Sequence, residues 1–132
     1  MSDQSDAFIF YDNLSQLSQG NEFVARVPRG ITTRDQLFAV LVRELNMPSY
    51  FGWNWDALED FLRNLSWIAC HRVIIAHEAV PGLESATLQT YLEVLAECVK
   101  HWRADEQHQL LVVFPEHAQA EIRTVQKGRN SP

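Results

Sequence analysis

Three carboxylates at helical spacing are the side chains of this 132-residue chain best arranged for chemistry. Asp56, Glu59 and Asp60 stand at i, i+3 and i+4, so on a helix they share one face. Asn54 is a good N-cap residue and is expected to begin that helix. Two such carboxylates can act as general acid and general base, as in glycoside hydrolysis, or they can form an anionic surface for a cationic target. An exposed helix face does not provide the unequal environments that a catalytic acid and base require, which disfavours catalysis.

Aromatic residues surround the start of this expected helix. Tyr50 and Trp53 flank Gly52 in the loop before Asn54, next to the acidic face. Rigid aromatic side chains beside anions are typical of protein-binding hot spots. The alternative is that the aromatic side chains fill the core and the carboxylates form a solvated face, with Asp56 interacting favourably with the helix dipole.

The other reactive side chains form no recognisable site. The histidines are His71, His77, His101, His108 and His117. None belongs to an HExxH motif, which disfavours a metal site. Cys70 precedes His71, but adjacency alone provides neither an exposed thiolate nor an oriented base, so a packed cysteine is favoured. Glycine-rich phosphate loops and GxSxG segments do not occur, and we expect no catalytic residue, no metal and no cofactor.

The composition describes one ordinary soluble domain with an acidic surface. The chain has eleven Lys and Arg and seventeen Asp and Glu. The resulting net charge of -6 disfavours direct binding of nucleic acid and favours a basic partner. Cys70 and Cys98 fit a reducing compartment better than a disulfide framework, and we expect both in or near the core. Signal-peptide and membrane-spanning patterns are lacking. These features predict a cytoplasmic protein without membrane contacts that is monomeric when free.

Short apolar runs alternate with helical patterns between the two ends of the chain. The runs at 23–27, 73–76 and 110–114 are rich in β-branched and aromatic residues, as expected for strands. Between them, leucine-rich stripes at helical spacing predict one helix that begins near Thr33 and ends before Pro48, a second after Asn54, and a third after Ser85. The predicted fold is α/β, a small, mainly parallel three-stranded sheet with the order β-α-α-β-α-β.

The two ends of the chain differ in composition from this middle part. Residues 1–22 carry four carboxylates and no Lys or Arg, and are expected to be an acidic extension that docks by the apolar patch at 8–11. Residues 23–120 are the predicted domain. Residues 121–132 are expected to be a flexible tail, because the final residues are too polar to bury much apolar surface.

The central segment resembles a known family. Residues 50–60 read Tyr-Phe-Gly-Trp-Asn-Trp-Asp-Ala-Leu-Glu-Asp, which is similar to the central motif of the barstar family, intracellular inhibitors of an extracellular ribonuclease. The preceding helix and the residues from Leu45 to Pro48 are similar as well, and the resemblance extends over roughly residues 23–114. It implies a barstar-like fold, in agreement with the order of elements predicted above.

The resemblance also implies a role for individual side chains. The loop and second helix of the family plug the active-site cleft of a basic, barnase-type ribonuclease, with carboxylates in place of substrate phosphates. By position, Tyr50 is the aromatic contact, Asp56 a supporting acid and Asp60 the principal anion. Glu97 is the nearest match to a glutamate on the later helix, with a solvated position as its alternative.

Two positions depart from the family pattern. The family has a Trp at the position of Glu59, and it has no aromatic residue at the position of Trp53. The target ribonuclease can therefore differ from that of the family. The complete set of predicted partner-binding residues is Tyr50, Trp53, Asn54, Asp56, Glu59, Asp60 and Glu97.

The sequence therefore predicts a non-enzymatic inhibitor that binds a basic, barnase-type ribonuclease one-to-one. An immunity or interaction protein of the same fold, directed against a different basic toxin or enzyme, is the first alternative. A small hydrolase that uses Asp56 and Asp60 is the second.

Overall fold

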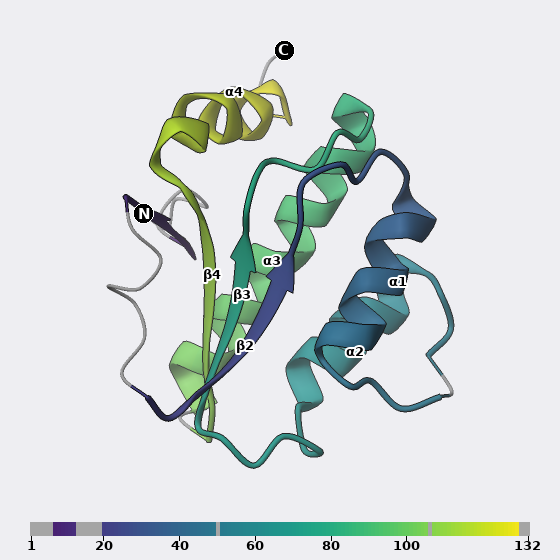
Figure 1. The fold of residues 1–132 in the computed structure, drawn as a ribbon, viewed down its shortest axis with the longest axis vertical. Helices are drawn as coiled ribbons and strands as arrows, with labels where there is room; N and C mark the ends of the chain where they lie inside the picture. Colours follow the sequence, from purple (N-terminus) through teal and green to yellow (C-terminus); the bar gives the residue numbers. More distant parts are fainter. Residues whose placement is uncertain (1–6, 13–19, 50, 106, 130–132) are drawn as a thin grey trace.

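A computed structural model describes residues 7–12, 20–49, 51–105 and 107–129 (Figure 1). Strands and helices alternate along most of the chain, and three helices lie against one face of a single sheet. The elements in chain order are β1 (Phe8–Tyr11), β2 (Glu22–Val27), α1 (Arg34–Glu44), α2 (Trp55–Asn64), β3 (Arg72–His77), α3 (Ser85–Asp105), β4 (Gln109–Pro115), the 3-10 helix η3 (Glu116–Ala118) and α4 (Gln119–Arg129).

The sheet has the strand order β1-β4-β3-β2, and every pairing is parallel. Ile75 of β3 is the register partner of Val112 in β4, and both side chains are fully buried on the helical side. Parallel neighbours require crossover connections, which α1 with α2 and α3 provide. The predicted mixed α/β fold with a parallel sheet is therefore confirmed.

The predicted number of strands is wrong, because the sheet has four strands and not three. The additional strand, β1, comes from the segment expected to be an extension, and it pairs with the edge of β4. Phe8 is 5% exposed and packs edge-on against Phe114 at 5.5 Å. The apolar patch at 8–11 is visible in the sequence, but its place as a fourth strand depends on non-local pairing with β4, which a local pattern cannot indicate. Residues 1–6 and 13–19 of the segment lie outside the described residues.

The C-terminal segment also differs from the sequence-based expectation of a flexible tail. Residues 121–129 belong to α4, in which Ile122 is completely buried. The Gln89 side chain on α3 donates a hydrogen bond of 2.8 Å to the carbonyl oxygen of Val125. The polar composition of the end of the chain predicted too little apolar burial to order this segment. Burial of Ile122 against the domain supplies that apolar contact. Residues 130–132 lie outside the described residues.

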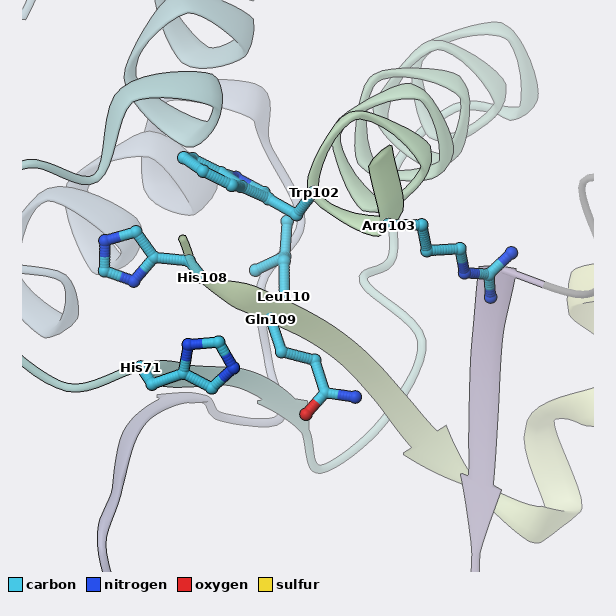
Figure 2. Close-up of a pocket in the computed structure, with 6 residues that line it drawn as sticks. All are labelled: His71, Trp102, Arg103, His108, Gln109 and Leu110. Carbon is cyan, nitrogen blue, oxygen red and sulfur yellow. The ribbon is translucent and has the colours of Figure 1, made fainter. Parts of the chain in front are cut away.

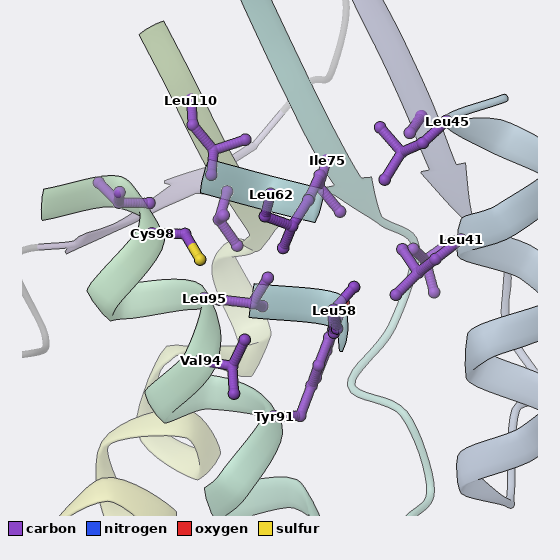
Figure 3. Close-up of a cluster of buried hydrophobic side chains, with 14 of the residues drawn as sticks. Leu41, Leu45, Leu58, Leu62, Ile75, Tyr91, Val94, Leu95, Cys98 and Leu110 are labelled. Carbon is purple, nitrogen blue, oxygen red and sulfur yellow. The ribbon is translucent and has the colours of Figure 1, made fainter. Parts of the chain in front are cut away.

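The contact between α2 and α3 forms the part of the core that positions the candidate site (Figure 3). Leu58 and Leu62 of α2 face Leu95 of α3, and all three side chains are fully buried. Burying a leucine stabilises a fold by about 2 kcal/mol. The Trp102 indole donates a hydrogen bond of 2.6 Å to the carbonyl oxygen of Leu62. The predicted leucine stripe of α2 is therefore confirmed, and it leaves the opposite face of that helix to solvent.

A buried polar pair lies where β3 meets α3. His77 is fully buried, and its Nδ1 lies 3.0 Å from the carbonyl oxygen of Val113. A carbonyl only accepts, so Nδ1 carries the proton and Nε2 accepts a hydrogen bond of 2.7 Å from the Tyr91 hydroxyl. Burial lowers the pKa of His77 to about 4, because the charged ring would lose its hydration.

Candidate partner-binding site

Asn54 fixes the start of α2 and the loop before it. Its Oδ1 accepts a hydrogen bond of 2.8 Å from the backbone N–H of Ala57, and its Nδ2 donates one of 3.1 Å to the carbonyl oxygen of Gly52. Asn54 is thus the N-cap that the sequence predicts. Its own role is to hold the aromatic loop against the first turn of α2.

Asp56 and Asp60 lie one helical turn apart on α2, and both are exposed. Within the part of the chain that the structure describes, neither carboxylate has an ion-pair or hydrogen-bond partner. Asp56 is in the first turn, where the positive end of the helix dipole favours an anion. These two carboxylates therefore present uncompensated negative charge to solvent.

Glu59 differs from its two acidic neighbours. It is partly buried, and its carboxylate forms an ion pair of 3.2 Å with Arg63, four residues later on α2. The neutralising role of Arg63 was not predicted, although the i, i+4 spacing of opposite charges is visible in the sequence. The acidic face is consequently less negative than three carboxylates alone suggest.

Glu97 lies on α3, exposed, with Lys100 at 4.0 Å. The next residue, Cys98, contacts α2, because its sulfur lies 3.8 Å from the carbonyl oxygen of Glu59. Burial raises the pKa of the Cys98 thiol to about 12, and the nearby carboxylates of Glu59 and Glu97 contribute to this increase. Glu97 therefore lies next in sequence to a residue of α3 that contacts α2.

The aromatic residues of the loop divide into a buried and an exposed group. Phe51 is 5% exposed and Trp55 is partly buried, so these two belong to the core, as the alternative interpretation of the loop expected. The Trp53 side chain, by contrast, is 44% exposed. Tyr50 lies outside the described residues.

Trp53 has an unusual backbone conformation. Its φ angle is 54°, in the left-handed region that bulky side chains rarely adopt. Such a conformation costs on the order of 1 kcal/mol and persists only where the surroundings enforce it. Ring contacts with Phe38 of α1, at 6.2 Å, and with Phe51, at 5.9 Å, hold the indole in place.

The sequence model of the barstar (barnase inhibitor) family matches residues 21–115. The chain belongs to the barstar family. The matched range contains β2 to β4 and the helices that carry Asp56, Asp60 and Glu97, while β1 and α4 lie outside it. No curated protein and no solved structure matches the chain.

A pocket of this barstar-family protein lies at the starts of β3 and β4 (Figure 2). Its volume is about 340 Å³. The His108 imidazole lies beside the Trp102 indole with ring centroids 5.1 Å apart, and His71 also lines the pocket. Among the described residues, no three His, Cys, Asp or Glu side chains gather as a metal site requires. None of the predicted partner-binding residues that the structure describes lines this pocket.

Within the described ranges of this barstar-family protein, no helix combines the length and the apolar character that are needed to cross a bilayer.

Proposed function

We propose that this barstar-family protein inhibits a basic ribonuclease of the extracellular type by covering its active site with α2 and the loop before it. The observation that carries the proposal is the pair of exposed, uncompensated carboxylates of Asp56 and Asp60 on one helix face. Membership in an inhibitor family supports it.

The proposed mechanism is electrostatic and steric. The carboxylate of Asp60 takes the place of a substrate phosphate and pairs with the cations of the ribonuclease active site, and Asp56 supports it from the first turn. Glu97 adds negative charge from α3. The aromatic side of the contact is formed by Tyr50 and Trp53, and Asn54 shapes it by holding the loop. The net charge of -6 steers the association with a basic protein.

The proposed role is non-enzymatic, and two exposed carboxylates support this. Asp56 and Asp60 are both exposed and stay hydrated, whereas a carboxyl group that acts as a general acid at neutral pH needs a desolvating environment. The same surface also suits immunity against another basic toxin or enzyme. That second function is favoured if the ribonuclease test below is negative while the acidic face still binds a basic protein.

The decisive experiment titrates the full chain into an RNA-cleavage assay with a barnase-type ribonuclease. We expect a stoichiometric end point for the unmodified protein and a displaced, shallow curve for Asp60→Asn. Glu121→Gln, an exposed position on α4, removes the same charge far from α2 and is the matched control. Complete cleavage at several-fold excess of the unmodified protein, at low and at physiological salt, would contradict the ribonuclease assignment.

A further inference from the structure

We infer that Trp53 is a platform for an arginine side chain of the partner, whose guanidinium stacks on the indole and pairs with the carboxylate of Asp56. The inference rests on the proposed function and deepens it, because it specifies which basic residue the partner must present beside α2. Four features of the described residues support it: exposure, ring packing, backbone conformation and neighbouring charge.

Exposure distinguishes Trp53 from the other large apolar side chains. Among the large apolar side chains that the structure describes, only Trp53 is exposed, with 44% of its surface accessible to solvent. An exposed indole beside charged groups is typical of a contact surface, because tryptophan buries a large area when a partner covers it.

The ring packing makes the platform rigid. Phe38 is fully buried and meets the indole at an interplanar angle of 75°, while Phe51 supports it at 52°. The guanidinium of Arg34 lies over the Phe38 ring, 5.5 Å from its centroid, and so occupies Phe38 rather than Trp53. A side chain held in its binding orientation loses little conformational entropy when the partner arrives.

The backbone around Trp53 is clamped in the same way. The side chain of Asn54 bonds to Gly52 on one side of Trp53 and to Ala57 on the other. This clamp holds Trp53 at its φ angle of 54°. Strained conformations that the surroundings enforce cluster at binding sites, where they serve to present a side chain.

The neighbouring charge selects the ligand. Asp56 follows Trp53 by three residues and has no ion-pair partner within the described ranges. An exposed indole and a free carboxylate three residues apart around the Asn54 cap suit a planar guanidinium, which stacks on an aromatic ring while its N–H groups pair with a carboxylate. The compact, strongly hydrated ammonium group of lysine is a poorer fit for the same surface.

Two peptides of equal charge test the inference independently of any ribonuclease. Fluorescently labelled hexa-arginine and hexa-lysine are titrated with the full chain at low salt, and binding is followed by fluorescence anisotropy. We expect hexa-arginine to bind about two- to fivefold more tightly, which is the size of a cation–π contribution at an exposed site. In Trp53→Asn the ratio should fall to about one, since asparagine tolerates the left-handed backbone and removes only the ring.

Asp60→Asn is the matched variant, because it removes charge from the same helix without touching the platform. It should weaken both peptides alike and leave their ratio unchanged. Equal binding of the two peptides to the unmodified chain would overturn the inference, as would a ratio that survives in Trp53→Asn or a failure of hexa-arginine to bind.

Inhibition of a barnase-type ribonuclease by the same preparations separates the two proposals. Inhibition without arginine preference overturns the Trp53 inference and leaves the proposed function intact. Arginine preference without inhibition overturns the ribonuclease assignment and supports the platform for another basic partner. If both hold, Trp53→Asn should raise the Kd for the ribonuclease at least about tenfold, as expected for a central tryptophan contact.

Discussion

The guanidinium of Arg63 lies 3.2 Å from the carboxylate of Glu59 and three residues after Asp60, so a cation stands within the acidic face of α2. This pair is partly exposed, and its contribution to stability is small. Its larger consequence concerns binding, because Arg63 reduces the negative potential that a basic partner meets.

Replacing Arg63 by Gln should therefore accelerate association with a basic ribonuclease. The variant leaves Glu59 uncompensated, and we expect the association rate constant at low salt to rise about two- to threefold. Stopped-flow tryptophan fluorescence at several salt concentrations measures this rate. Arg123→Gln on α4, which removes an exposed charge far from α2, is the control. A rate that is unchanged, or an increase that persists in high salt, would contradict the electrostatic explanation.

The acidic side chains should differ in their importance for inhibition. Asp60→Ala should weaken binding by about 2–5 kcal/mol, because it leaves the partner's cations buried and unpaired. Asp56→Ala should cost less than Asp60→Ala. Inhibition constants from RNA-cleavage assays provide this order.

Glu97→Gln should have the smallest effect of the three, since Lys100 already pairs with Glu97 in the free protein. An effect of Glu97→Gln as large as that of Asp60→Ala would show that α3 and not α2 carries the principal anion.

The buried His77 predicts a loss of stability in acid. Its pKa is lowered from 6.5 to about 4 in the folded state, so the unfolded chain binds more protons between these values. The contribution is complete above about pH 6.5 and decreases as the pH falls towards 4, with a loss on the order of 2 kcal/mol at pH 4.5. Urea unfolding at pH 7 and pH 4.5 measures it. In His77→Gln the difference between the two pH values should shrink, and an unchanged difference would assign the effect to other groups.

The N-terminal strand should be part of the folded unit. Phe8→Ala removes a buried ring that contacts Phe114, and we expect the free energy of unfolding to fall by about 3 kcal/mol. Asp12→Asn, at an exposed position just beyond β1, should leave it nearly unchanged. Thermal and urea unfolding compare the variants. If Phe8→Ala unfolds like the unmodified chain, β1 contributes nothing to the stability of the sheet.

Local signals in the sequence determined the elements that carry the candidate site. The Asn54 cap and the stripe of Leu58 and Leu62 are short-range features, because capping and helical periodicity involve residues within two turns. They were sufficient to predict where α2 begins and which of its faces carries the carboxylates. The β-branched runs similarly predicted β2, β3 and β4.

Tertiary structure decided which of these side chains are available to a partner. Only packing of α1 against the loop leaves Trp53 exposed while Phe51 is buried. Only packing of α3 on α2 brings Cys98, the neighbour of Glu97, against Glu59. The pairing of β1 with β4 likewise joins residues about one hundred positions apart. Such contacts depend on the shapes and charges of segments distant in sequence, so a pattern confined to one stretch of residues cannot contain them.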